Sequence, residues 1–98
     1  MKDALGLLET KGLTAAVNGA DAAVKAAGVV IAKIEKIGSA YVTLALKGDV
    51  ASVKAAISAA TEEAAKYGKV ISSCVIPRPH IEVLKGFNLM KAQKHNNE

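Results

Sequence analysis

The sequence predicts an α+β fold in which two main helices cover one face of a four-stranded antiparallel sheet and a short helix follows near the C-terminus. Short runs alternate apolar and polar residues with a period of two, which is typical of half-buried strands. Two longer stretches repeat apolar residues every three or four positions, as amphipathic helices do. The runs follow one another as strand, helix, strand, strand, helix, strand. This is the order of a ferredoxin-like, split βαβ fold.

The first half of this order is a strand followed by a helix. Residues 4–8 are an apolar run that fits a buried strand, and residues 9–12 end it. A helix is expected over residues 13–27, after which Gly28 fits the left-handed residue that commonly follows a helix. Gly19 lowers the helix propensity of this stretch by up to about 1 kcal/mol relative to alanine. The apolar positions that define the helix are Leu13, Val17, Ala20, Val24 and Ala27.

Two further strands are expected at residues 30–35 and 42–47, where apolar and polar residues alternate. The segment between them, residues 36–40, reads Lys-Ile-Gly-Ser-Ala and is a hairpin loop. Gly38 permits positive φ and leaves no side chain over the backbone, so the peptide groups beside it can face open space or a neighbouring subunit. In an isolated chain, a loop of this kind is an ordinary turn.

The second half of the order is a helix followed by a strand. Asp49 is a favourable N-cap for a helix over residues 50–67, whose apolar stripe ends at Gly68. A fourth strand is expected at residues 70–76, because the prolines that follow it end the pattern. Residues 80–85 are long enough for one or two helical turns.

The composition predicts a domain whose core is built from small aliphatic side chains. The chain has 98 residues, of which 51% are hydrophobic and only 3% aromatic. A chain this short buries a modest fraction of its surface, which favours association with further copies. We expect the domain to span residues 1–87 and a polar, flexible tail to follow at residues 88–98.

Charge and cysteine content restrict the class of protein. The formal net charge of +4 comes from lysines that are scattered along the chain without interleaved aromatic residues. The concentrated basic face typical of nucleic-acid binding is therefore missing. Cys74 is the single cysteine and lies in an apolar run, so we expect a small core or semi-buried residue. Without a signal peptide or an 18-residue apolar stretch, we expect a cytoplasmic protein that binds neither nucleic acid nor membrane.

No residue pattern predicts catalysis or cofactor binding. The sequence lacks a glycine-rich phosphate-binding motif, a nucleophile elbow and metal-ligand spacing. His80 and His95 have no spaced carboxylate, cysteine or second histidine that would complete a metal or acid–base site. Glu62 and Glu63 are adjacent helix positions that point about 100° apart, so we expect a solvated face. The expected protein is not an enzyme, and it has no catalytic residue, no metal and no cofactor.

Arg78 is the only arginine and stands between two prolines, Pro77 and Pro79. Each proline fixes its own φ and favours extended geometry in the residue before it, so Arg78 has a predictable direction. A planar guanidinium on a stiff segment is suited to docking into the carbonyl or carboxylate groups of a partner. An ion pair within the same chain is the alternative.

Four segments together resemble one protein family. They are residues 4–12 at the start, residues 20–27 in the first helix, residues 36–39 in the hairpin, and the Ile-Pro-Arg-Pro-His segment at residues 76–80. With these segments in order over residues 4–86, the chain is similar to bacterial microcompartment shell proteins of the single-domain, hexamer-forming type, which carry a BMC domain. The resemblance implies a structural protein, a cyclic hexamer that tiles into the facets of a shell around enzymes.

The resemblance also implies roles for individual residues. Six copies of the hairpin loop would converge on the ring axis and line a pore for small polar metabolites. The pore-lining residues would be Lys36, Ile37, Gly38, Ser39 and Ala40. The outer edge, where the ring meets neighbouring hexamers and other shell proteins, would contain Lys25, Arg78 and His80.

Two positions depart from the pattern of the family. Asn18-Gly19 stands where relatives usually carry better helix formers, which questions the rigidity of the first helix. Ala40 stands where many relatives have a second glycine, and its Cβ restricts the conformations of the loop. The Pro-Arg-Pro-His ending is more similar to compartments for diols, ethanolamine or choline than to carboxysomes.

A small-ligand-binding regulatory module of ferredoxin-like fold is the alternative function. It predicts a dimer or trimer that binds an amino acid or nucleotide between subunits and gains stability from that ligand. The shell interpretation predicts hexamers that form sheets with no ligand present.

Overall fold

The computed structural model describes residues 3–77, which form helices and strands in the predicted order. The elements are β1 (Ala4–Lys11), α1 (Leu13–Ala26), β2 (Val30–Ile37), β3 (Tyr41–Gly48), α2 (Val50–Ala64) and β4 (Lys69–Ile76). The strands form one sheet in the order β2-β3-β1-β4, and each neighbouring pair is antiparallel. The α+β class and the four-stranded antiparallel sheet are therefore confirmed.

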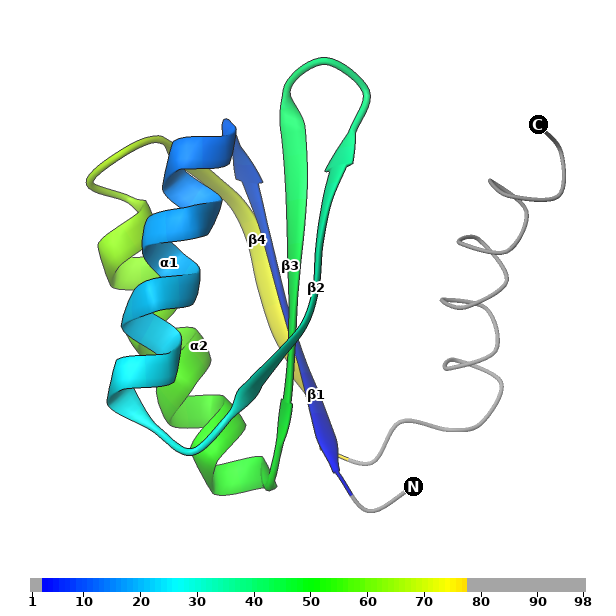
Figure 1. Ribbon diagram of the computed structural model, residues 1–98, viewed down its shortest axis with the longest axis vertical. Helices are drawn as coiled ribbons and strands as arrows, with labels where there is room; N and C mark the ends of the chain where they lie inside the picture. The colour runs from blue at the N-terminus through cyan, green and yellow to red at the C-terminus, as the bar shows by residue number, and fades with distance from the viewer. Residues whose placement is uncertain (1–2, 78–98) are drawn as a thin grey trace, which may run out of the picture.

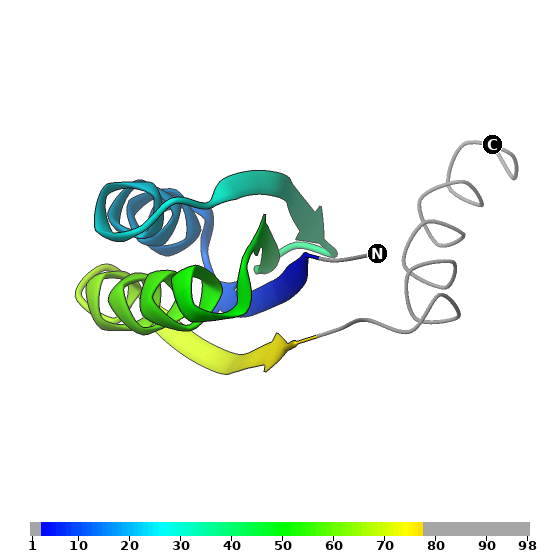
Figure 2. The same ribbon diagram turned by 90° about the horizontal axis from the view of Figure 1, so that it is seen from below.

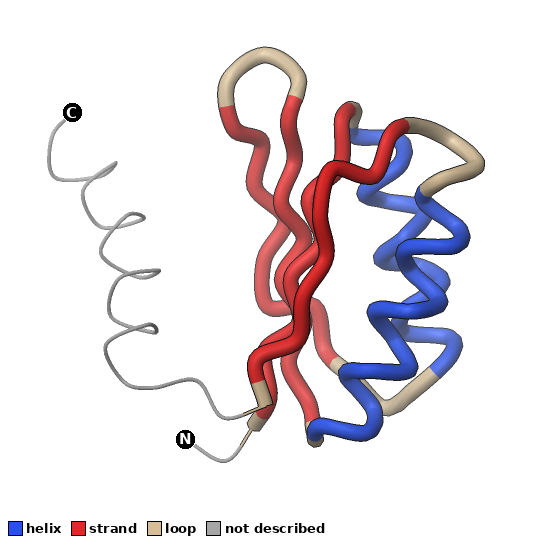
Figure 3. Tube along the Cα trace, turned by 180° about the vertical axis from the view of Figure 1, so that it is seen from behind, coloured by secondary structure: helices blue, strands red, loops and turns tan. Residues whose placement is uncertain are grey.

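Both helices cover the same face of the sheet. Figure 1 shows α1 and α2 side by side along one side of the strands, and Figure 2 shows the helices and the strands as two layers. Seen from behind in Figure 3, the strands again lie to one side of both helices. Among residues 3–77, the opposite face of the sheet carries no helix. The predicted two-layer arrangement is confirmed.

The core lies between the helices and the central strands, β1 and β3. Alanines from both helices fill the space around a few larger aliphatic side chains. Burial of apolar surface contributes roughly 25 cal/mol per Å², so a core of small side chains is stable only where the layers approach closely. The largest fully buried apolar side chains are Leu8, Leu44, Leu46, Val42 and Val53.

Close approach of the two helices explains Gly19, which the sequence predicts only as a weak point of α1. Gly19 is buried, and a Cβ at this position would lie 3.1 Å from the carbonyl oxygen of Ala60 and 3.3 Å from the Cβ of Ala64. Both residues belong to α2, so the glycine allows the helices to pack more closely than a larger residue would. The lower helix propensity of Gly19 is offset by this packing.

The left-handed conformation predicted for Gly28 is wrong, and so is the predicted end of the second helix. The chain leaves α1 in an extended conformation at Ala27, with φ of −156°, and Gly28 therefore has no positive φ. α2 ends at Ala64 and not at position 67, and Gly68 also lacks positive φ. A Cβ on Gly68 would lie 2.8 Å from the carbonyl oxygen of Lys11. Gly68 is therefore needed for close packing against the end of β1.

The predicted N-cap of α2 is confirmed. The Oδ1 atom of Asp49 accepts a hydrogen bond from the backbone N–H of Ser52 at 2.9 Å, and Oδ2 accepts one from the Ser52 hydroxyl at 2.9 Å. These bonds satisfy a donor that the first turn of a helix leaves unpaired. They also lower the pKa of the Asp49 carboxyl, because both favour its ionised form.

Two predictions about β1 and β4 need correction. β1 was expected to end at residue 8, but it continues to Lys11, because it is paired with a strand on each side. Cys74 is exposed, contrary to the prediction of a core or semi-buried residue. It lies on the edge strand β4 and pairs with Leu7, whose side chain points away from the helices because that of Leu8 points toward them.

β2 is a strand as predicted, but its apolar side chains are not the buried ones. Val30, Ile31 and Ile34 are 60%, 42% and 39% exposed. The more covered side chains of this strand are Lys33 and Glu35, which form an ion pair. A half-buried strand was expected, and β2 instead presents apolar surface at the edge of the sheet.

Several predictions lie outside the described residues. They are the helical turns at residues 80–85, the polar tail at residues 88–98, and the interface residues Arg78 and His80.

Candidate functional site

The candidate site is the loop that joins β2 to β3. β2 ends at Ile37, β3 begins at Tyr41, and these two residues pair with each other across the hairpin. Gly38 has φ of +65°, as the sequence predicts, in the left-handed region that glycine adopts without strain. The hairpin extends beyond the end of the helical layer, at the top of Figure 1.

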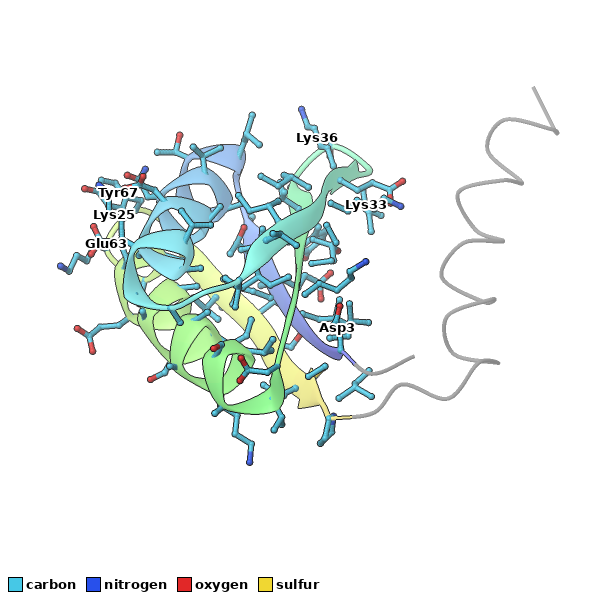
Figure 4. The ribbon with its side chains drawn as sticks, turned by 60° about the horizontal axis from the view of Figure 1, so that its bottom comes forward. Asp3, Lys25, Lys33, Lys36, Glu63 and Tyr67 are labelled. Carbon is cyan, nitrogen blue, oxygen red and sulfur yellow. The ribbon has the colours of Figure 1, made fainter. Side chains whose placement is uncertain are left out.

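The side chains of this loop face open surroundings. Lys36, Gly38 and Ser39 are exposed, and Ala40 is half-buried. A Cβ built on Gly38 would meet no atom of the described residues within 4 Å. Figure 4 shows Lys36 beside the tip of the hairpin, pointing away from the body of the subunit. The loop therefore presents an ammonium, a hydroxyl and uncovered backbone at one end of the molecule.

The loop is attached to the start of α1 by one backbone hydrogen bond. The N–H of Gly12 donates to the carbonyl oxygen of Ala40 at 2.7 Å. The hydroxyl of Thr10, whose side chain is fully buried, donates to the carbonyl oxygen of Gly12 at 3.1 Å. The sequence predicts residues 9–12 as the end of a strand and as part of a segment that resembles the family, but it gives neither Thr10 nor Gly12 a role in the loop. A glycine between a strand and a helix is the only signal that could have indicated them.

Lys25 lies on the last turn of α1, at the end far from the hairpin. Its Nζ atom is 2.8 Å from Oδ2 of Asp21, and the side chains are 74% and 58% exposed. The hydrogen bond to Asp21 and the charge of its carboxylate raise the pKa of Lys25. Figure 4 places Lys25 on the helical side, near Glu63 and Tyr67. The structure therefore separates Lys25 from the five loop residues, which lie together.

A hollow of about 280 Å³ lies on the face of the sheet away from the helices, and the sequence gives no signal for it. The Ser72 hydroxyl donates to Oε1 of Glu9 at 3.5 Å within it. Residues 3–77 contain no group of three side chains that could hold a metal ion. The residues that line the hollow are Leu7, Glu9, Thr43, Ser72, Ser73 and Cys74.

No helix within residues 3–77 combines the length and the apolar character that a membrane span requires.

Comparison with protein families matches residues 4–79 of the chain to the BMC domain. The chain is 52% identical over 84 residues to the bacterial microcompartment shell protein PduA of Citrobacter freundii, and the match covers 86% of this chain and 90% of that protein. It is 45% identical over 78 residues to the shell protein EutM of Escherichia coli, with 80% of each chain covered. It is 46% identical over 82 residues to the carboxysome shell protein CcmK2 of Synechocystis, with 82% and 80% covered.

A solved structure supports the same similarity. The fold matches the crystal structure of a microcompartment protein from Desulfitobacterium hafniense with a TM-score of 0.77 and 32% sequence identity. The match covers 87% of this chain and 48% of the other, so this chain spans about half the length of that protein.

Proposed function

Because the chain belongs to the BMC domain family, we propose that it is a structural shell protein, which forms cyclic hexamers that tile into the facets of a bacterial microcompartment. Its location is then the shell, within the bacterial cytoplasm, and its partners are further copies of itself and other shell proteins. The observation that carries the proposal is the projecting hairpin, in which Gly38 is left-handed and Ser39 is exposed. This hairpin lies within residues 4–79, which match the BMC domain. Relatives with this domain are named as shell proteins, so the proposed role is structural and not catalytic.

The finer features of the fold belong to the same proposal. The element order and the strand order β2-β3-β1-β4 support a ferredoxin-like arrangement. We extend the shell domain over residues 1–87, with a short helix after β4, and assign residues 88–98 to a polar tail.

The hairpin loops of six subunits are proposed to meet on the ring axis and to line a pore. Residues 36–40 then contribute the Lys36 ammonium, the Ser39 hydroxyl and the peptide groups around Gly38. Hydroxyl and N–H groups stabilise polar solutes, and the positive field of Lys36 favours anionic ones. The open space around Gly38 supports this role, because no atom of residues 3–77 lies within 4 Å of a Cβ built on it.

The edge between hexamers is proposed to contain Lys25, Arg78 and His80. The high exposure of Lys25 supports the assignment, because its ammonium is accessible to a neighbouring ring. Each edge contact is weak, but a layer repeats it many times, and multivalency then stabilises the sheet.

Electron microscopy of the purified protein tests the assembly. We expect hexamers that form sheets with no ligand added, whereas a small-ligand-binding regulatory module would give dimers or trimers stabilised by a ligand. Lys25→Ala and Arg78→Ala should abolish sheets and leave discrete hexamers. Asp21→Asn is the matched control, because it removes the ion pair of Lys25 and keeps the lysine. Sheets should persist in this variant, and their persistence in Lys25→Ala as well would contradict the edge assignment.

Permeation of a small polar solute through assembled shells tests the pore. Ser39→Leu should reduce the permeation rate, because a branched apolar side chain replaces the hydroxyl at the constriction. Ser39→Thr keeps the hydroxyl and should retain most of the rate. Unchanged permeation in Ser39→Leu would count against Ser39 as a pore-lining residue.

A further inference from the structure

We propose that Thr10 and Gly12 are positioning residues for the hairpin loop, because a chain of two hydrogen bonds runs from the buried Thr10 hydroxyl through Gly12 to Ala40. Both hydrogen bonds, which we call the loop support, form within one subunit. The effect of the loop support on solute passage rests on the proposed pore function.

The bond between Gly12 and Ala40 continues the pairing of β1 with β3 into the loop. The last paired residues of these strands are Lys11 and Tyr41, so Gly12 and Ala40 occupy the next position of the same register. The Gly12 N–H donates to the Ala40 carbonyl at 2.7 Å there. The loop is thus held by β2 through the Ile37 pair on one side and by the end of β1 on the other.

Thr10 fixes the peptide group next to this bond, because the Gly12 carbonyl belongs to the peptide that follows Gly12 and the Gly12 N–H to the one that precedes it. Its side chain is fully buried, and its hydroxyl donates to the Gly12 carbonyl at 3.1 Å. A buried hydroxyl without a partner is strongly unfavourable, so this bond restrains the orientation of Gly12. Thr10 is also the only buried polar residue among the described ones, which makes a packing role alone a poor explanation for it.

Gly12 has a conformation that other residues rarely adopt. Its φ is +97° and its ψ is 141°, and within the part of the chain that the structure describes a Cβ built on it would meet no atom within 4 Å. The need for glycine therefore comes from the backbone and not from lack of space. Because Gly12 is also the N-cap of α1, one residue fixes both the start of the helix and the hairpin loop.

This arrangement decides which groups of the loop face the axis. The Ala40 carbonyl is directed toward Gly12 of its own subunit, so it is withdrawn from the solute path. The exposed residues Gly38 and Ser39 remain, with N–H and hydroxyl donors. Loss of the support would release a carbonyl acceptor into the loop and move the constriction, which would weaken the preference for polar and anionic solutes.

Amide hydrogen exchange of the full chain at Gly12 tests the inference, since this amide donates the supporting bond. Thr10→Val keeps the side-chain shape and removes the hydroxyl, and it should speed exchange at Gly12 by about three- to tenfold, as expected for one lost hydrogen bond. Exchange in residues 4–8 of β1 should change by less than about twofold.

Thr61→Val is the matched control, because the Thr61 hydroxyl donates to the Ile57 carbonyl at 2.7 Å within α2, far from the loop in the chain. It should leave exchange at Gly12 unchanged. Gly12→Ala provides a second variant, which should alter permeation of a polar solute in rings that still form. Unchanged exchange at Gly12 in Thr10→Val, or equal acceleration along all of β1, would overturn the inference.

Native mass spectrometry of the same samples separates this inference from the shell function. If wild type is not hexameric, the shell function fails while exchange at Gly12 still reports on the loop support. If hexamers form and Thr10→Val shows no selective acceleration, the loop support fails while the shell function stands.

Discussion

Two neighbouring strands, β3 and β2, have similar apolar side chains but opposite environments. Leu44 and Leu46 of β3 are fully buried beneath the helices. Their partners in the register are Ile34 and Ile31 of β2, which are 39% and 42% exposed. The two strands lie about 4.8 Å apart, so the helical layer ends within the width of one strand.

The difference indicates that the helices bury the apolar side chains of the central strands within one subunit but leave those of β2 partly exposed. The core between the helices and the central strands closes within one chain. An apolar edge strand is unfavourable for a protein that acts alone, because it offers unpaired backbone and apolar surface to other chains. β2 leads directly into the hairpin loop, so a ring that brings the loops together also brings β2 close to another copy.

Substitution of paired residues across these strands gives the largest expected effect. Leu44→Ala should lower the free energy of unfolding by about 2–5 kcal/mol, because it leaves a cavity in the closed core. Ile34→Ala removes a similar volume from the half-exposed partner and should cost less than about 1 kcal/mol in the subunit. Urea unfolding at a protein concentration low enough to keep the subunits separate measures both values. Equal losses would mean that β2 belongs to the core of the single chain.

A charge on β2 should affect assembly more than folding. Ile34→Lys places an ammonium where an apolar surface meets a neighbouring copy, so each contact should lose about 1 kcal/mol or more of apolar burial. Far-ultraviolet circular dichroism should remain as in wild type, while size-exclusion chromatography shifts from rings toward single subunits. Intact rings in this variant would show that β2 faces solvent in the assembly.

This comparison also shows how far the sequence predicts the structure. Period-two alternation locates β2 and β3 correctly, because it depends on the local geometry of a strand. It does not predict that Ile34 is 39% exposed, since this depends on how far the helical layer extends across the sheet. The packing roles of Gly19 and Gly68 cannot be predicted for the same reason, because they come from contacts with residues distant in the chain.

The candidate site is predicted in part. The position of the hairpin follows from the alternating residues on either side of it, and its glycine conformation follows from Gly38, whose positive φ is confirmed. The contribution of Thr10 and Gly12 could not be predicted, because the register that brings Gly12 opposite Ala40 is a property of the whole sheet. The pore and edge roles stay predictions, since they concern contacts between copies.

Alanine substitution of two glycines separates backbone strain from packing in the loop. Gly38→Ala should cost about 1 kcal/mol, because alanine is disfavoured at φ of +65°. Gly28 is the matched control, since a Cβ at either position would meet no atom of residues 3–77 within 4 Å, and of the two glycines only Gly38 has positive φ. Gly28→Ala should be neutral or stabilising by up to about 1 kcal/mol. Equal effects of the two changes on the midpoint of thermal unfolding would indicate that φ at Gly38 adapts freely.

The smallest effect is expected at the exposed N-cap of α2, the helix that contributes Val53, Ala56 and Ile57 to the core. The pKa of Asp49 is lowered below its ordinary value of 3.8, because the carboxylate accepts the Ser52 N–H and hydroxyl. A group with a lowered pKa in the folded state contributes stability above its unfolded pKa, and that contribution disappears as the pH falls through the folded pKa.

Asp49→Asn should therefore isolate this contribution, because asparagine caps helices as well as aspartate does but does not titrate. Wild type should lose more stability than the variant between about pH 4 and pH 2, while all other carboxyls titrate alike in both proteins. Thermal unfolding across this range measures the difference. Parallel stability curves would mean that the capping bonds persist in the unfolded chain or that they do not require the carboxylate. Either result would contradict a contribution of the Asp49 charge to the stability of the cap.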